Sequence, residues 1–521
     1  MNYTVSDAKT NNKVCLRYKQ DYHSLWINGF EVLKTLNANT PIGLSDLSFD
    51  SGASAEQFYG KTKQLQYYNS ALTDRTRTTN VLDIFYRYGT RTIIHNRIDM
   101  AQKLKFGNGT WATKEGSTLA YNDENNNYKP LPFNFERDSI ATRVNKEGLI
   151  EVVGRDVPRI DYKDSSEGVL LLEPSRANAY LHSDYLYNFS GDKTFNHATS
   201  PEGVKNATLL TKTSASDQFL NIAWTGTTIS ASSDYTMSIF VKHNGDDVNV
   251  KYEYNNSNDW GGVPWLALFE VRASGVTKST VGNCTSNVED FGNGWYRLKV
   301  FVTSGASITA SSPANLFRVI GASAETILVY GAQMEKGSYA SSYIPTSGSS
   351  VTRSADTANG AGNSEVFNDS EGVLFADIAA LTEIDTYRAI SISSGSTNDR
   401  INIWYWNNGK FKIDLHYGAI SQYNFDFDAD MTAFNKIAFK YKQNDFCVFH
   451  NGFKIGIDTS GNTPVGLSEL SFDRADGAFP NYGKTKEIGY YDTILTDAEL
   501  EYMTSYRSLN ELVTELNLNE L

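Results

Sequence analysis

Two stretches of this chain of 521 residues are copies of each other, and this repeat constrains the fold more than any other feature. Lys13–Asp74 aligns without a gap to Lys436–Asp497, and about 27 of the 62 aligned positions are identical. Both copies carry an NGF turn, an LSFD string and a YGKTK string. We therefore expect each copy to form the same four-stranded unit.

The two copies differ in what precedes them. The later copy follows strand-like sequence over Gly372–Asp430, whereas the earlier copy begins close to Met1. The earlier copy is therefore expected to be half of a sandwich, with an apolar face and open edges that need a cover. Residues 81–135 or a neighbouring subunit are the favoured covers; another protein, or a sequence start that is internal to the natural protein, are the alternatives.

Short alternating segments between Asn, Gly, Asp and Ser turns predict an all-β chain of antiparallel sandwiches. The chain also has 8 Trp, 31 Tyr and 27 Phe, residue types that are enriched in strands. In each of four segments one side-chain parity is apolar and the other mostly polar, as half-buried strands require. These segments are Thr236–His243, Val248–Tyr254, Arg297–Thr303 and Asn435–Lys442.

Helical signals are confined to the C-terminal end. Thr496 precedes DAELEYMTSY, and Glu499 stands three residues on, which predicts a capping box. Further on, four apolar residues share one face of a predicted helix, namely Leu509, Leu512, Val513 and Leu516. We expect this face to dock on the protein, with contacts within a trimer as the alternative.

Charge and hydropathy exclude several classes of partner. The 47 basic and 60 acidic residues give a net charge of −13, which disfavours nucleic acid and anionic membranes. No apolar run is long enough to span a bilayer, and MNYTVSDAKT does not have the pattern of a secretory signal. Cys15, Cys284 and Cys447 are too few and too scattered for a disulfide framework, so we expect them to be small buried hydrophobes.

Three long strings resemble segments of known proteins. The first, FERDSIATRVNKEGLIEVVGRDVPRIDY with GVLLLEPSRANAYLHSDY, resembles a segment of bacteriophage tail-fibre and head-fibre proteins. The second, NGWYRLKVFV with LVYGAQMEKGSYASSYIPTSGSSVTRSAD, resembles the carbohydrate-binding-module-like jelly roll that follows it there. The third, Gly372–Ser505, resembles the concanavalin A-like (laminin-G-like) domains of phage fibres, although the N-terminal half-domain departs from the usual arrangement.

The resemblance implies a structural protein of a phage virion, in a fibre, a spike or a capsid decoration. It implies a homotrimer that contacts other virion proteins and a glycan of the host surface or of mucus, on a particle assembled in the cytoplasm of the bacterial host. It also predicts a division of the chain into a partial concanavalin A-like unit (1–80), a connector with short strands (81–164), a jelly roll (165–345), a linker (346–364), a concanavalin A-like domain (365–505) and a C-terminal helix (506–521).

Catalysis is not expected. Glycoside hydrolases with this fold keep two carboxylates flanking the scissile bond, often as ExDxxE on one strand. Glu383 and Asp385 match the first pair, but Arg388 stands at the third position and would hold neighbouring carboxylates ionised. A glycan depolymerase with lectin modules, or a structural spacer without a ligand, are the alternative functions.

No cofactor is expected, with calcium as the one alternative. Asp426, Asp428 and Asp430 alternate on one strand parity, but Met431 and Ile437 occupy positions where a calcium loop needs Gly and Glu. A solvated acidic segment is the favoured interpretation.

Sugar binding needs an exposed aromatic face with polar groups nearby. In the hairpin INIWYW-NNG-KFKIDLHY, a three-residue loop would place Trp404 and Trp406 beside Asp414 and His416 on the outer face of a sheet. A two-residue turn would bury both tryptophans instead. The first register separates polar from apolar side chains better, so these four residues are the predicted ligand site. Trp260, in the polar turn NNSNDWGG, is predicted to be a further contact. The remaining aromatic candidates are predicted to be core residues, namely Trp224, Trp265, Trp295, Tyr252 and Tyr254.

Overall fold

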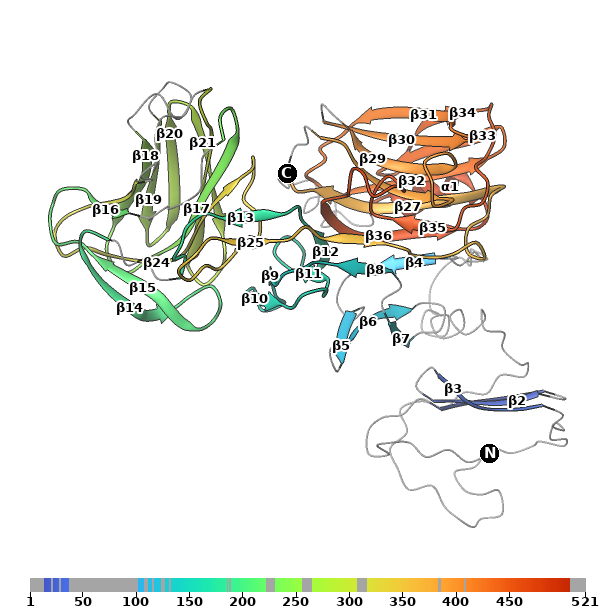
Figure 1. The fold of residues 1–521 in the computed structure, drawn as a ribbon, viewed down its shortest axis with the longest axis horizontal. Coiled ribbons are helices and arrows are strands. Elements are labelled where there is room, and N and C mark those ends of the chain that lie inside the picture. The colour runs from blue at the N-terminus through green and yellow to red at the C-terminus, as the bar shows by residue number, and fades with distance from the viewer. Residues whose placement is uncertain are drawn as a thin grey trace, which may run out of the picture. The chain divides into compact units, whose positions relative to one another are not determined.

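The computed structural model describes residues 14–19, 22–27, 30–36, 102–106, 111–114, 117–122, 127–130, 133–184, 186, 189–221, 230–254, 265–306, 316–382, 386–406 and 409–506. The chain is an all-β protein of antiparallel sheets with a short helix near its C-terminus (Figure 1). It divides into two compact units, one formed by residues 1–99 and 112–130 and the other by residues 100–111 and 131–521.

In the first unit, the described part of the N-terminal repeat is a sheet of three strands. These are β1 (Val14–Lys19), β2 (Tyr22–Ile27) and β3 (Phe30–Leu36). Their counterparts in the later copy are β32 (Asn435–Lys442), β33 (Asp445–His450) and β34 (Phe453–Asp458).

Both copies have the same strand register. Val14 faces Ile27 just as Ile437 faces His450. A register shift falls between Leu25 and Trp26 in one copy, and between Val448 and Phe449, the aligned positions, in the other. The repeat in sequence is therefore a repeat in structure over these three strands. A second sheet in the first unit consists of β5 (Trp111–Lys114), β6 (Ser117–Asn122) and β7 (Asn127–Pro130).

The second unit contains two β-sandwiches (Figure 1). The jelly-roll sandwich has a six-stranded sheet, in the order β14 (Asp192–Thr199), β15 (Lys205–Thr211), β24 (Thr326–Lys336), β17 (Asp234–His243), β22 (Trp295–Thr303) and β21 (Cys284–Asp290). Its five-stranded sheet has the order β16 (Gln218–Asn221), β23 (Leu316–Ile320), β18 (Val248–Tyr254), β19 (Trp265–Arg272) and β20 (Gly275–Val281). Tyr252, Trp265 and Trp295 are at most 2% exposed, so their prediction as core residues is confirmed.

The C-terminal sandwich has a sheet with the order β11 (Arg159–Asp161), β12 (Val169–Leu172), β36 (Gly483–Tyr491), β27 (Glu371–Ala380), β32, β33 and β34. Its second sheet has the order β31 (Ile420–Asp428), β30 (Lys410–Tyr417), β29 (Arg400–Trp406), β28 (Arg388–Ser393) and β35 (Glu469–Ser471). The helix α1 (Asp497–Thr504) begins at Thr496 with the predicted capping box, and buried Leu500 packs with Val373 and Phe449 on the outer face of the first sheet.

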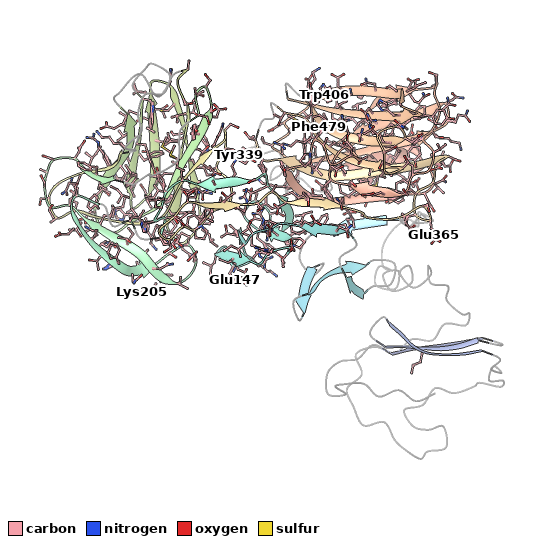
Figure 2. The ribbon with its side chains drawn as sticks, viewed as in Figure 1. Glu147, Lys205, Tyr339, Glu365, Trp406 and Phe479 are labelled. Atoms are coloured by element: carbon pink, nitrogen blue, oxygen red, sulfur yellow. The ribbon has the colours of Figure 1, made fainter. Side chains whose placement is uncertain are left out.

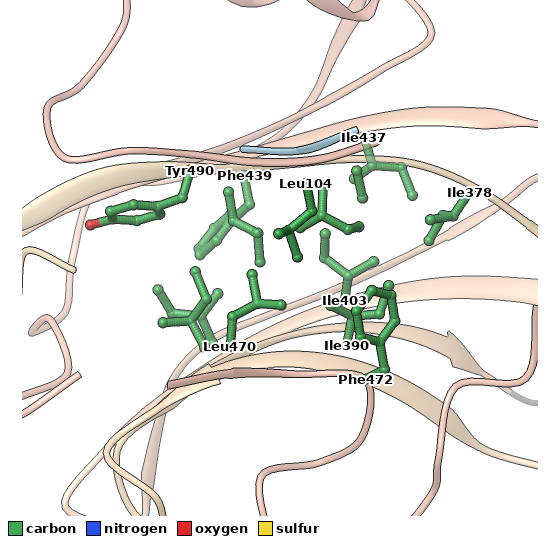
Figure 3. Packing of buried hydrophobic residues seen from close by; sticks show 14 of the residues in the cluster. Leu104, Ile378, Ile390, Ile403, Ile437, Phe439, Leu470, Phe472 and Tyr490 are labelled. Carbon is green, nitrogen blue, oxygen red and sulfur yellow. The ribbon is translucent and has the colours of Figure 1, made fainter. Parts of the chain in front are cut away.

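The C-terminal sandwich draws strands from distant parts of the chain. Strand β4 (Gln102–Lys105) pairs with β36, where Leu104 faces Ile488. Leu104 packs in the core with Tyr490 and Phe439 (Figure 3). Two-stranded sheets join further segments: β8 (Asn134–Glu136) pairs with β26 (Thr357–Asn359), β13 (Arg176–Asn178) with β25 (Val351–Arg353), and β9 (Ala141–Val144) with β10 (Ile150–Val153).

These pairings correct the predicted boundaries. Val169–Leu172, assigned to the jelly roll from sequence, pairs with β36, because a strand buried along its whole length needs a partner on each side. Residues 346–364 are not a free linker, since β25 and β26 are paired and Arg353 and Asp356 are buried. The jelly-roll sandwich is inserted between β12 and the later strands of the C-terminal sandwich.

The predicted cover of the N-terminal half-domain stays a prediction. Of the candidate residues 81–135, Leu104, Phe106, Phe133 and Phe135 pack in the core of the C-terminal sandwich. Residues 112–130 belong to the same compact unit as β1–β3. Cys284 and Cys447 are buried thiols, as predicted. The stripe from Leu509 to Leu516 lies outside the described residues.

Candidate functional site

The predicted hairpin register is confirmed. In the β29–β30 pair, Trp404 faces Lys412 and Trp406 faces Lys410, as the three-residue loop requires. Ile403, Tyr405 and Phe411 point into the core. The opposite face of the same two strands therefore carries Trp404, Trp406, Lys412, Asp414 and His416.

The prediction that both indoles are exposed is wrong for Trp404, which is only 3% exposed. Its Nε1–H donates to Asp414 Oδ2 over 3.0 Å, and the ring centroid lies 5.7 Å from that of Phe479. Asp414 is itself 4% exposed and accepts a second hydrogen bond from Asn402 Nδ2 over 2.6 Å. Trp404 and Asp414 are thus structural groups beneath a cover.

The cover is the segment Asp473–Tyr482, which crosses the outer face of the five-stranded sheet. The backbone N–H of Ala389 donates to the Phe479 carbonyl over 2.9 Å, which attaches the segment to β28. Phe479 has a φ of 56°, a left-handed conformation that costs about 1–3 kcal/mol in a bulky residue and persists where its surroundings enforce it. The Arg474 guanidinium, 4.8 Å from the Phe479 ring, helps to hold this ring against Trp404.

Trp406 remains partly exposed, next to the cover (Figure 2). Its ring centroid lies 4.2 Å from that of Tyr387, which is also partly exposed, and 5.6 Å from that of Trp404. The Lys412 ammonium lies 4.1 Å from the same ring, a cation–π contact. We call Tyr387, Trp404, Trp406 and Phe479 the aromatic cluster.

A row of polar side chains crosses the sheet beside the aromatic cluster. Ser471, Ser391, Asn402 and Asp414 are direct neighbours on four adjacent strands, and all four are buried. Ser391 Oγ and Asn402 Oδ1 have no hydrogen-bond partner among the described residues. Buried polar groups of this kind are normally paired, but these two atoms are enclosed and are not part of the exposed surface of the aromatic cluster.

His416 lies at the other side of this row and is partly exposed. Its Nδ1 is 3.9 Å from Asp414 Oδ1. Burial lowers the pKa of His416 more than the neighbouring carboxylate raises it, so the ring is neutral at pH 7. A neutral imidazole can both donate and accept hydrogen bonds.

Several other predicted residues are placed elsewhere or not described. Trp260, Trp224, Glu383 and Asp385 lie outside the described residues. Of the acidic residues considered for calcium, Asp426 pairs with Lys410 over 3.1 Å, and Asp430 accepts hydrogen bonds from Thr432. Within the described ranges, no group of His, Cys, Asp and Glu is arranged to hold a metal, and no helix is long and apolar enough to cross a membrane.

Sequence reasoning missed a buried ionic network where the two sandwiches meet. Arg159 donates to Glu173 over 2.6 Å and also pairs with Asp356, while Arg353 donates to Glu173 over 2.7 Å. Arg137 donates to Asp356 over 3.1 Å. The guanidinium groups hold the pKa of Glu173 well below its usual range. These residues occupy the strings FERD, PRIDY, LLLEPSR and VTRSAD, so charges in the strings that carry the resemblance pair with one another where the two sandwiches meet.

Comparisons with known proteins give likeness in structure alone. No family model matches the sequence, and no curated protein matches it. Part of the chain is similar to a CBM40 module of the Ruminococcus gnavus IT-sialidase, with 18% identity, 28% of this chain and 94% of that chain covered, and a TM-score of 0.25. A SAP-like pentraxin from Limulus polyphemus matches with 12% identity, 29% of this chain and 76% of that chain covered, and a TM-score of 0.23. Domains LG4-5 of the mouse laminin α1 chain match with 11% identity, 53% of this chain and 87% of that chain covered, and a TM-score of 0.19. Because these TM-scores are low, the function of this chain is inferred from its own residues.

Proposed function

We propose that this chain is a non-catalytic structural protein of a bacteriophage virion and that its C-terminal sandwich binds a glycan of the host surface at the aromatic cluster. The phage assignment rests on the sequence resemblance, which covers most of residues 13–505. The observation that carries the binding site is the partly exposed pair of rings Tyr387 and Trp406, with centroids 4.2 Å apart and planes tilted by 36°, beside the partly exposed Lys412. Aromatic rings contact the C–H face of a sugar, and neighbouring polar groups bind its hydroxyls.

In this proposal the two tryptophans have different roles. Trp404, fixed by Asp414 and Phe479, supports the cluster from below. Trp406 and Tyr387 supply the contact surface. The Lys412 side chain is long and only partly buried, so a sugar ring can displace its ammonium from the indole while that ammonium donates to a sugar hydroxyl.

Binding at one such site is expected to be weak. Repeated copies on a particle would raise the overall avidity without any new contact, because later binding events become intramolecular. A homotrimer, which the resemblance implies, would already present three sites. A depolymerase remains the alternative function, and turnover of a polysaccharide that Asp385→Asn abolishes would establish that alternative instead.

The test is a glycan array of bacterial surface polysaccharides and mucin glycans, probed with the full chain and with Trp406→Ala. Phe453→Ala is the matched control, because Phe453 is a 71% exposed aromatic residue on β34 of the same sandwich. We expect Trp406→Ala to weaken binding about tenfold or more, the effect of losing about 1.4 kcal/mol of contact, and Phe453→Ala to bind like wild type. Equal binding by wild type and Trp406→Ala would show that the aromatic cluster is not the site.

A further inference from the structure

Four Asn–Gly pairs lie in the part of the chain that the structure describes, and they begin at Asn244, Asn293, Asn359 and Asn451. In such a pair the backbone nitrogen of the glycine can attack the side-chain amide of the asparagine, because glycine has no side chain to hinder the approach. The reaction needs both groups to be free to move. The hydrogen bonds around each pair therefore decide which of the four can react.

Three of these pairs are restrained at the attacking group, the glycine N–H. In each of them this N–H donates a hydrogen bond to a side chain. The acceptors are His243 Nδ1 at 3.3 Å, Glu469 Oε1 at 3.0 Å and Thr504 Oγ1 at 3.1 Å, for the glycines that follow Asn244, Asn359 and Asn451. The side chains of Asn244 and Asn451 are also hydrogen-bonded, to Thr326 Oγ1 and to the Lys436 N–H. Bonds of this kind oppose the approach of the two groups.

The pair Asn293–Gly294 is different. It forms the tip of the hairpin between β21 and β22, where the Trp295 N–H donates to the Gly292 carbonyl over 2.9 Å. Asn293 and Gly294 have φ angles of 53° and 76°, as the central residues of a type I′ turn require. Both residues are exposed, and within the described ranges neither the Asn293 side chain nor the Gly294 N–H makes a hydrogen bond. The two reacting groups are therefore free to meet.

Lys242, on β17, places a positive charge at the reacting peptide bond. Its ammonium donates to the main-chain carbonyl of Asn293 over 2.7 Å. This carbonyl and the Gly294 nitrogen belong to the same amide, so the negative charge that develops when the nitrogen loses its proton is shared with the oxygen that Lys242 binds. A cation placed where charge develops lowers the barrier to that step. The stem of Lys242 packs under the turn, since a Cβ atom built at Gly294 would lie 3.4 Å from Lys242 Cε.

We propose that Asn293 is a site of spontaneous deamidation, activated by Lys242, with water as the co-reactant. The Gly294 nitrogen gives its proton to solvent and bonds to Asn293 Cγ, while the Cγ–Nδ2 bond breaks and the side-chain nitrogen takes up a proton and leaves as ammonia. Water then opens the cyclic imide at either carbonyl, which gives aspartate or isoaspartate.

The modification would change both the charge and the backbone of the hairpin tip. Aspartate and isoaspartate each add a carboxylate beside Lys242, and isoaspartate also lengthens the backbone inside the turn that the Trp295 N–H closes. The site is on the jelly-roll sandwich and does not depend on the function proposed for the aromatic cluster.

Peptide mapping by mass spectrometry tests the proposal. The full chain is kept in mildly alkaline buffer at physiological temperature, and the conversion of each Asn–Gly pair is followed over time. We expect Asn293 to convert about tenfold faster or more than Asn244, Asn359 or Asn451 in the folded chain. In urea the four should convert at similar rates, because the fold no longer distinguishes them.

Two substitutions of Lys242 test the activation. Lys242→Met keeps the aliphatic stem without the ammonium and should slow the conversion of Asn293 about threefold or more, whereas Lys242→Arg should retain most of the rate. The matched control is Lys278→Met, because the Lys278 ammonium also donates to a main-chain carbonyl, that of Ser286 at 2.6 Å, away from any Asn–Gly pair. It should convert Asn293 like wild type, and melting temperatures should show that the variants are folded.

The proposal is overturned if Asn293 in the folded chain converts no faster than Asn451, or if the difference between them persists in urea. It is also overturned if folded Lys242→Met converts Asn293 at the wild-type rate.

Discussion

Replacing Trp404 with alanine should destabilise the C-terminal sandwich strongly. The indole is 3% exposed and is enclosed by Phe479, Trp406 and Asp414. Truncation of a buried tryptophan costs about 3–5 kcal/mol. Asp414, also buried, loses the Nε1–H donor, and an unpaired buried acceptor costs about 1–3 kcal/mol more.

The assay is differential scanning calorimetry of the full chain and its variants. For a domain of about 150–250 residues, 1 kcal/mol shifts the melting temperature by about 2–4 °C, so the lower bound of the summed loss, about 4 kcal/mol, predicts a fall of at least about 8–16 °C. Trp404→Phe keeps most of the ring but not the donor and should lose about 1–3 kcal/mol. A melting temperature of Trp404→Ala within about 2 °C of wild type would refute the buried, hydrogen-bonded indole.

Three further predictions concern stability. Glu173→Gln should cost about 3–5 kcal/mol in urea denaturation, because it leaves Arg353 buried without its carboxylate and Arg159 with Asp356 alone, and an unchanged midpoint would contradict the network. Leu104→Ala should lower the melting temperature of the C-terminal sandwich by an amount equivalent to about 2–5 kcal/mol, whereas no effect there would contradict the pairing of β4 with β36. Burial lowers the pKa of His450 from 6.5 to about 4, so between these two pH values the unfolded chain takes up a proton while the folded chain keeps this ring neutral. The free energy of unfolding should therefore decrease as the pH falls from about 6.5 to about 4. Denaturation across that range should show a smaller decrease in His450→Gln than in wild type.

Local sequence patterns correctly predicted strands, the register of the hairpin and the helix cap, because each of these depends on residues close together in the sequence. The alternation of β18 and β32 defined both strands, and the segregation of polar and apolar residues predicted the register that places Trp404 opposite Lys412. The capping box at Thr496 is likewise a signal within one turn of the chain. In each case the residues that decide the structure lie close together in sequence.

The features that the sequence did not predict depend on contacts between residues far apart in the chain. Trp404 is covered by Phe479, some 75 positions later, and no local pattern shows that this segment crosses the sheet. Strand β4 is four residues long and finds its partner hundreds of positions away. Glu173 and Arg353 are charged residues of a kind that is usually exposed to solvent. They form a buried ion pair because the two sandwiches pack against each other at this place.

The central claim is that the aromatic cluster of the C-terminal sandwich binds a glycan. The most direct measurement is the affinity of the full chain for its strongest glycan on the array, compared between wild type and Trp406→Ala. The account predicts that Trp406→Ala remains folded but binds that glycan about tenfold or more weakly. Wild-type affinity in a folded Trp406→Ala variant would contradict it.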